Sequence, residues 1–203
     1  MSIKLYFAPQ TRSITALWML EEAGAPYELV RMNIRAPGHP SAEFRQVNPM
    51  GKVPALQDGG TGFGETAAIL LYIADKFPQA KLAPLPSDPN RGRFLQWLMY
   101  PATTIEPAMM EKRRGAEPMT TAAGWGDYDR AMAALEGALT PGQWLFGQQF
   151  TAADLYVASS LGFGMMFGMI DKRPAFVDYH GRASARPAYK RARDIEAAEM
   201  AKG

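Results

Sequence analysis

The chain has 203 residues, of which 47% are apolar, and a formal net charge of +2 at pH 7. So small a charge gives no reason to expect a nucleic-acid partner, and the apolar fraction is enough for one large or two small packed domains. Cysteine is absent, which excludes disulfides, a cysteine nucleophile and zinc–thiolate sites. The two histidines, His39 and His180, are too few for the usual histidine clusters, so we expect no metal.

No apolar run approaches the roughly 18 residues that a membrane span needs. The first residues also lack the charged and apolar blocks of a signal peptide. The sequence therefore predicts a cytoplasmic protein without a membrane partner.

The first part of the chain alternates between strand and helix patterns. Ile3, Leu5 and Phe7 alternate with polar residues and predict a strand. Apolar residues at helical spacing follow and end at Gly24, residues 27–32 resemble a second strand, and a short helix starts after Ser41. Because a helix connects the first two strands, we expect them to be parallel.

The segment from Asn48 to Leu56 contains the dipeptide Val53-Pro54. Proline has no N–H to give a neighbouring strand, so this segment is not an ordinary central strand. The residue before a proline is held extended, and Val53 is therefore predicted to offer its N–H and C=O to the backbone of another peptide. A cis Val53-Pro54 bond suits such a bend. The segment predicts a docking edge for a small peptide.

After a predicted hairpin turn at residues 58–62, the chain reaches Glu65 and Thr66 at the start of an apolar helical run. Thr66 is the predicted N-cap of this helix. A helix N-terminus favours a carboxylate, and Glu65 beside it can hold an ammonium group. An amino-acid head group carries one of each, so the pair predicts a site for such a group.

The remainder of the chain shows almost no strand pattern and is predicted to be all-helical. Asp88 and Pro89 are expected to start its first helix, which Pro101 should bend or break, and Pro107 argues against an uninterrupted helix beyond residue 106. Residues 151–154 form a capping box for a later helix. The basic residues between 182 and 193 are interleaved with apolar residues and are interpreted as a solvent-exposed helix face.

Together these patterns predict an α/β unit followed by an all-α unit. The first is a thioredoxin-like βαβαββα domain over residues 1–78, and the second is an all-helical domain over residues 89–203. Residues 79–88 contain too many prolines to form an element and are predicted to be the linker.

With these elements in this order, the sequence resembles the soluble glutathione transferases over almost its whole length. The resemblance rests on the segment from Asn48 to Leu56, on Glu65-Thr66 in the place of the family's usual Glu-Ser, and on residues 150–154 in the place of its helix-capping motif. It implies that Val53, with Pro54, pairs with the cysteinyl part of glutathione. It also implies that Glu65 and Thr66 hold the γ-glutamyl end.

The resemblance implies further contacts at the other end of glutathione. His39 and Lys52 stand where some classes of the family hold the glycine carboxylate. For His39, a loop histidine without such a role is the alternative.

The residue that activates the thiol is left open between two hydroxyls. The family has a tyrosine, serine or cysteine near the end of the first strand, where this chain has Pro9-Gln10-Thr11-Arg12-Ser13. Thr11 aligns best with the serine of the hydroxyl-type classes and Ser13 second, and a helix N-cap is the alternative for both. Arg12 stands where cysteine-type members have their cysteine, which excludes that chemistry, and it adds positive charge beside bound glutathione.

The resemblance implies a dimeric detoxification enzyme that adds the thiolate of glutathione, its cosubstrate, to hydrophobic electrophiles. Isomerase, dehalogenase or peroxidase activity is a variant of the same site, and a non-catalytic glutathione-binding or interaction protein is the alternative. The electrophile is expected against an apolar wall in the second domain, for which ordinary packing is the alternative at each candidate: Tyr100, Thr104, Met109 and Met165.

Overall fold

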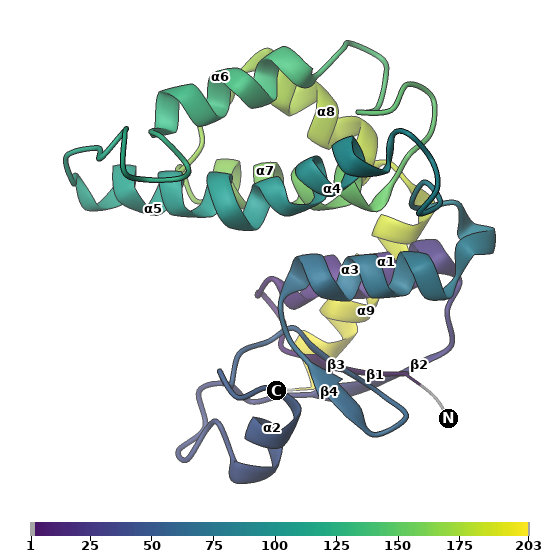
Figure 1. Cartoon of the computed structure of the whole chain (residues 1–203). Coiled ribbons are helices and arrows are strands. Elements are labelled where there is room, and N and C mark those ends of the chain that lie inside the picture. The colour runs from purple at the N-terminus through teal and green to yellow at the C-terminus, as the bar shows by residue number, and fades with distance from the viewer. Residues whose placement is uncertain (1–2, 203) are drawn as a thin grey trace. The chain divides into compact units, whose positions relative to one another are not determined.

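The structure is a computed structural model that describes residues 3–202. The chain divides into two compact units. The first runs up to Lys81 and is completed by the chain from Arg186 onward, and the second runs from Leu82 to Ala185. The boundary at Lys81 lies within the segment expected to be the linker. Figure 1 shows the elements of both units.

The first unit is built on a four-stranded mixed sheet with the strand order β2-β1-β3-β4. β1 pairs parallel with β2, and β3 pairs antiparallel with β4 across the predicted hairpin turn, as the sequence predicted. β1 also pairs antiparallel with β3. This is the thioredoxin-like arrangement. The strands are β1 (Ile3–Phe7), β2 (Tyr27–Arg31), β3 (Ala55–Asp58) and β4 (Thr61–Phe63).

Helices cover both faces of this sheet, because alternate residues of each strand point to opposite faces. Helices α1 (Ser13–Ala23) and α3 (Thr66–Lys76) lie on one face, and the short α2 (Ala42–Val47) lies on the other (Figure 1). Ile3, Leu5 and Phe7 of β1 are almost fully buried. Tyr6 packs instead against Phe44 of α2, with 5.2 Å between ring centroids.

The last helix, α9 (Pro187–Ala201), belongs to the first unit, which differs from the expected domain of residues 89–203. It packs on α1, where Arg186 pairs with Glu22 at 2.6 Å and Arg191 with Glu21 at 2.7 Å. Arg191 remains exposed, as the sequence suggested, whereas Arg186 is half-buried, and both arginines hold α9 to α1. Their acidic partners stand near the start of the chain, where a local charge pattern cannot reveal them.

The second unit is helical, and α7 (Ala152–Met166) is its most buried helix. Both α4 and α8 pack against α7, and α5 packs against α6. The other helices are α4 (Arg91–Tyr100), α5 (Glu106–Arg114), α6 (Tyr128–Ala138) and α8 (Pro174–Ser184).

The prolines near the start of this unit act differently from the prediction. Pro101 does not break the helix, because α4 continues through a π-helical turn, Pro101–Ile105, directly into α5. Pro107 is the second residue of α5 and follows the π-helical turn directly, so it does not interrupt the helix beyond residue 106 either. α4 also begins at Arg91 rather than at Pro89, and Asp88 accepts the N–H of Asn90 at 2.7 Å in the preceding turn.

The predicted capping box at the start of α7 is present. The Asp154 carboxylate is completely buried and accepts backbone N–H groups from Thr151 at 2.8 Å and Leu145 at 2.7 Å. It also accepts hydrogen bonds from the hydroxyls of Thr151 at 2.6 Å and Tyr179 at 2.5 Å. Four donors on one buried carboxylate tie α7 to α8 and to the chain before α7.

An ion pair between Asp58 and Lys76 gives the first unit a pH-dependent contact. Asp58, at the end of β3, accepts hydrogen bonds from Lys76 and Tyr72 of α3. These bonds, that from the Lys76 ammonium above all, lower the pKa of the Asp58 carboxyl. A lowered native pKa contributes stability that is present above the unfolded value of about 3.9 and is lost as the pH falls through the native value.

We therefore expect Asp58→Asn to be less stable than the parent protein at pH 7, by an amount that shrinks below about pH 4. Urea unfolding midpoints measured between pH 2.5 and pH 7 check this expectation. Lys76→Met serves as the matched variant and should show the same trend. A difference between Asp58→Asn and parent that stays constant across this range would show that the pair carries no linked proton.

Candidate functional site

The turn between β1 and α1 carries the two candidate hydroxyls. The Ser13 hydroxyl accepts the N–H of Ala8 at 3.1 Å and lies 2.8 Å from the Ala8 carbonyl oxygen. Thr11 Oγ1 lies 2.7 Å from the same carbonyl oxygen and 2.6 Å from Ser13 Oγ. The two side chains therefore form one network around the backbone of Ala8.

Burial separates the two hydroxyls. Ser13 has no exposed surface, whereas Thr11 is half-buried. Only Thr11 therefore has a surface that a bound thiol can contact. Neither residue is the N-cap of α1, since that position is held by Arg12, which makes no side-chain capping hydrogen bond.

The loop before β3 is held by the amide of Asn48, which is 7% exposed. Its Nδ2 donates to the Lys52 carbonyl at 2.8 Å, and its Oδ1 accepts the N–H of Met50 at 3.2 Å. The β1–β3 ladder ends where Tyr6 pairs with Ala55, so Val53 lies outside it.

Two prolines of this region have cis peptide bonds, at Val53–Pro54 and at His39–Pro40. Pro54 is buried, whereas Val53 is half-buried and packs against a small core that contains Phe44 and Ala55.

The register of the sheet brings the turn and this loop to the same edge. Because β1 and β3 are antiparallel, the end of β1 lies beside the beginning of β3, with Tyr6 opposite Ala55. The chain leaves β1 into residues 8–13 and enters β3 from Val53. The candidate hydroxyl and the candidate docking edge are therefore neighbours.

Glu65 has a strained backbone at the start of α3. Its φ is 64° and its ψ is 113°, and it holds the N-cap position without a side-chain capping bond. Thr66, which the sequence predicted as the cap, is instead the first helical residue. A non-glycine residue in such a conformation costs on the order of 1–3 kcal/mol, and strain of this kind is common where a ligand binds. The Glu65 side chain is exposed beside the free N–H groups of the helix start.

The candidates for the glycine end differ in exposure. Lys52 is exposed and His39 is half-buried, as is Arg12, which is expected to add positive charge near the thiol and not at the glycine end. The His39 ring lies near Phe44, with 5.8 Å between ring centroids. His39 thus has a packing role in the loop whether or not it contacts a ligand.

The four residues expected to line an electrophile site lie in the second unit. Met109 is 2% exposed and Met165 is 9% exposed, so both pack as core residues. Tyr100 and Thr104 are half-buried. The Tyr100 hydroxyl donates to the Ala131 carbonyl at 2.8 Å, and burial raises the pKa of Tyr100, which keeps this hydroxyl protonated.

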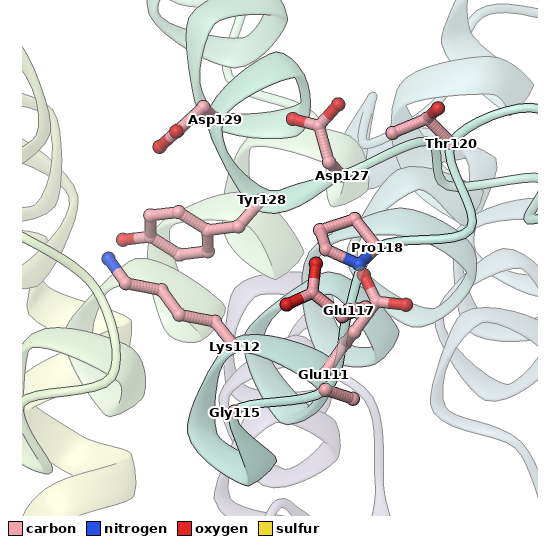
Figure 2. Close-up of a pocket in the computed structure, with 10 residues that line it drawn as sticks. Glu111, Lys112, Gly115, Glu117, Pro118, Thr120, Asp127, Tyr128 and Asp129 are labelled. Atoms are coloured by element: carbon pink, nitrogen blue, oxygen red, sulfur yellow. The ribbon is translucent and has the colours of Figure 1, made fainter.

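The second unit also contains a pocket of about 540 Å³ between the end of α5 and the start of α6, shown in Figure 2. Its lining does not include the four residues above. Its charged groups are Lys112 and four carboxylates, which makes it unsuitable for a hydrophobic electrophile. The carboxylates belong to Glu111, Glu117, Asp127 and Asp129.

Several charges of this pocket already have partners inside the protein. The Lys112 ammonium lies 3.6 Å from the centre of the Tyr128 ring and 3.4 Å from Asp171. Asp127 caps α6 by accepting the N–H of Arg130 at 2.8 Å. We therefore interpret the charged groups of this pocket as structural groups that hold the loop between α5 and α6.

One group that the sequence analysis did not identify contacts the turn before α1. The carboxylate of Glu196, on α9, accepts the N–H of Gln10 at 2.8 Å. No local pattern marks Glu196 as different from other acidic residues of an amphipathic helix. Within residues 3–202, no group of three or more histidines and carboxylates is arranged to hold a metal, and no helix combines the length and apolarity that a membrane crossing requires.

Family models match both parts of the chain. Residues 1–75 match the model of the N-terminal domain of glutathione S-transferases, and residues 118–182 match the model of their C-terminal domain. The glutathione S-transferase GstA of Escherichia coli O157:H7 is 30% identical over 165 residues, which cover 78% of this chain and 81% of that protein.

Solved structures give the same result. A glutathione transferase from Methylococcus capsulatus is 33% identical with a TM-score of 0.80 over 96% of this chain and 98% of that one. A sphingomonad glutathione S-transferase complexed with glutathione is 32% identical with a TM-score of 0.77, over 96% and 98% of the two chains.

Relatives with other names are also found. The disulfide-bond oxidoreductase YfcG of Escherichia coli is 27% identical over 92% of both chains. Elongation factor 1-gamma of Artemia salina is 29% identical over 170 residues. The matched part covers 78% of this chain and 37% of that protein.

Proposed function

Because the chain belongs to the glutathione S-transferase family, we propose that its first unit binds glutathione and directs the thiolate of this tripeptide at a hydrophobic electrophile. The observation that carries the proposal is the position of Thr11. Its half-buried hydroxyl stands at the end of β1, beside the entry to β3 that holds Val53. We further propose that the protein acts in detoxification as a cytoplasmic homodimer.

We assign the backbone of glutathione to the edge formed by Val53 and Pro54. An extended peptide can exchange backbone hydrogen bonds with Val53, because this residue lies outside the β1–β3 ladder. The buried Asn48 amide fixes the Lys52 carbonyl and so sets the direction of the chain into Val53. Lys52, with His39, is available for the glycine carboxylate.

We assign the γ-glutamyl group to the start of α3. The exposed Glu65 carboxylate pairs with the ammonium group of the γ-glutamyl residue. The free N–H groups beginning at Thr66 face the carboxylate of that same γ-glutamyl residue. The strained backbone of Glu65 supports this assignment. An unstrained N-cap residue would be enough to start the helix, so the unfavourable φ of Glu65 is better explained by a bound ligand.

Thr11 activates the thiol by donating a hydrogen bond to its sulfur. The thiolate is the nucleophile, and a free thiol with a pKa of about 8.5 is only a few per cent ionised at neutral pH. Ser13 can donate to Thr11 Oγ1 at 2.6 Å, which releases the Thr11 proton from the Ala8 carbonyl toward the sulfur. Arg12 and the start of α1 add positive potential.

The arrangement also supports a second candidate, a glutathione-binding protein without efficient transferase chemistry. Both hydroxyl protons can be used within the turn, since Thr11 and Ser13 both lie within 2.8 Å of the Ala8 carbonyl oxygen. A hydroxyl that keeps this internal bond does not polarise a thiol. Turnover of a chlorinated aromatic compound with glutathione separates the two candidates, and rates at background level favour the binding protein.

For the electrophile we retain Tyr100 and Thr104, which keep exposed surface, as its candidate contacts. Met109 and Met165 are buried core residues of the same unit. Isomerase, dehalogenase and peroxidase reactions would use the same thiolate on other substrates.

Glutathione binding by Glu65→Gly tests the site directly. Glycine adopts a φ of 64° without strain, so we expect no loss of stability, whereas the lost carboxylate should weaken glutathione binding by about tenfold or more. Titration calorimetry gives the affinity and thermal unfolding gives the stability. The absence of glutathione uptake by the parent protein would overturn the proposed function, and equal affinities of parent and variant would remove Glu65 from the site.

A further inference from the structure

A buried carboxylate on α9 holds the turn that carries Thr11. The Glu196 side chain is 3% exposed, and its Oε1 accepts the backbone N–H of Gln10 at 2.8 Å. Gln10 immediately precedes Thr11 in the sequence. The contact therefore joins a helix at the end of the chain to the turn that the proposed thiol activation requires.

The backbone of Gln10 needs such a partner. Its φ is 59°, in the left-handed region that a residue with a Cβ atom rarely adopts. A carboxylate accepts a backbone N–H more strongly than a neutral oxygen does. The bond to Glu196 therefore stabilises a conformation that the chain alone disfavours.

The bonds inside the turn do not constrain Gln10. The Ser13 hydroxyl holds the N–H of Ala8, and the Thr11 hydroxyl lies against the Ala8 carbonyl. These contacts fix Ala8 relative to Thr11 and Ser13, but none of them involves the backbone N–H of Gln10. Glu196 accepts that N–H.

We infer that Glu196 is a positioning residue for Thr11, an inference that rests on the proposed function. It does not contact glutathione itself. Through the N–H of Gln10 it fixes the place from which Thr11 donates to the sulfur. Arg193, whose Nη1 lies 2.6 Å from Glu196 Oε2, balances the charge of the buried carboxylate.

Two roles of Glu196 predict opposite effects on the thiol. The negative charge by itself opposes formation of a thiolate nearby, so its removal alone would lower the pKa of the thiol. Loss of the acceptor releases Gln10 and lets Thr11 move, which raises that pKa. Glu196→Gln removes the charge and keeps an acceptor, whereas Glu196→Ala removes both.

We expect Glu196→Ala to raise the pKa of the bound glutathione thiol by about one unit and to lower kcat/KM about tenfold at neutral pH. The affinity for glutathione should change little, because Val53, Glu65 and Thr66 stay in place. In Glu196→Gln the thiol pKa should stay at or slightly below that of the parent protein, because the acceptor is kept and only the charge is lost. Ultraviolet thiolate absorbance titrated against pH gives the pKa, and calorimetry gives the affinity.

Glu199→Ala is the matched control. Glu199 lies on the same helix, is 9% exposed, and pairs with Lys202 at 2.5 Å and Arg31 at 3.9 Å rather than with the turn. The proposal is overturned if Glu199→Ala shifts the thiol pKa as much as Glu196→Ala. A lowered pKa in both Glu196 variants also overturns it, because this result would show that only the charge acts.

Two further outcomes keep this inference separate from the proposed function. A parent protein without thiolate absorbance contradicts the proposed function and the inference with it, whereas a normal pKa in Glu196→Ala contradicts the inference alone. If Glu196→Ala does not fold, Glu196→Asp replaces it, since this variant keeps the charge and withdraws the acceptor by one methylene. Its thiol pKa should also rise, and an unchanged value would overturn the inference.

Discussion

Replacing Asp154 with alanine is expected to lower the free energy of unfolding by about 3–5 kcal/mol, the largest effect on stability that we predict. The carboxylate accepts hydrogen bonds from two backbone N–H groups and two hydroxyls at 2.5–2.8 Å, and it is completely buried. Its removal leaves donors of Leu145, Thr151 and Tyr179 without a partner in a place that water does not reach. Natural domains have about 5–15 kcal/mol of stability in all, so this loss is large.

Asp127→Ala is the control for this experiment. Asp127 also caps a helix, by accepting the N–H of Arg130, but its side chain remains 22% exposed. Loss of such a cap costs about 1 kcal/mol because water replaces the carboxylate. Urea unfolding midpoints of both variants give the comparison. Equal losses would mean that Asp154 acts as an ordinary cap and that its burial and its bonds to α8 add nothing.

The elements that the sequence predicted are those with local signals. β1 follows from the alternation of Ile3, Leu5 and Phe7, and the end of α1 follows from Gly24, which adopts a φ of 59°. Ser41 caps α2 by accepting the N–H of Phe44 at 3.2 Å. In each case the residues that specify the feature lie within a few positions of it, so the sequence alone is enough.

Features that depend on distant partners were not predictable in this way. α9 belongs with α1 because Arg186 and Arg191 find acidic partners on α1, and a pattern within residues 182–193 says nothing about those partners. Glu196 has the same difficulty. Its importance comes from the N–H of Gln10, which no spacing in the sequence connects to it.

The prolines of the second unit show a different limit. Pro101 was expected to bend or break the helix, on the assumption that each turn repeats the same hydrogen bonds. The turn that begins at Pro101 changes the repeat to that of a π-helix, and the chain passes on into α5. Such a change of pairing leaves no residue signature that separates it from a break.

Burial separates the two candidate hydroxyls, which the sequence ordered only by their alignment with the family's serine. Thr11 and Ser13 are two positions apart, and either fits a helix start or a thiol partner in the sequence. In the structure Ser13 is fully buried and its hydroxyl accepts the N–H of Ala8. Thr11 is therefore the candidate whose side chain keeps solvent-exposed surface. This difference makes Thr11 the position at which a substitution tests the chemistry without removing the support of the turn.

Thr11→Val is expected to raise the pKa of the bound glutathione thiol by about 2 units, which corresponds to about 2.7 kcal/mol of lost thiolate stabilisation. Valine keeps the shape of threonine and removes the donor. The turn should survive, because once Thr11 Oγ1 is removed the Ser13 hydroxyl can donate to the Ala8 carbonyl, which lies 2.8 Å away. At neutral pH the thiolate fraction, and with it kcat/KM, should fall by up to about 100-fold.

The pH profile identifies the cause of this loss. A raised thiol pKa moves the rise of kcat/KM to more alkaline pH, so that parent and Thr11→Val converge once both thiols are ionised. Thr11→Ser keeps a hydroxyl on the same atom and should restore most of the activity, with the thiol pKa near that of the parent. A Thr11→Val protein with lower activity at every pH and an unchanged thiol pKa would show that Thr11 shapes the site without activating the thiol.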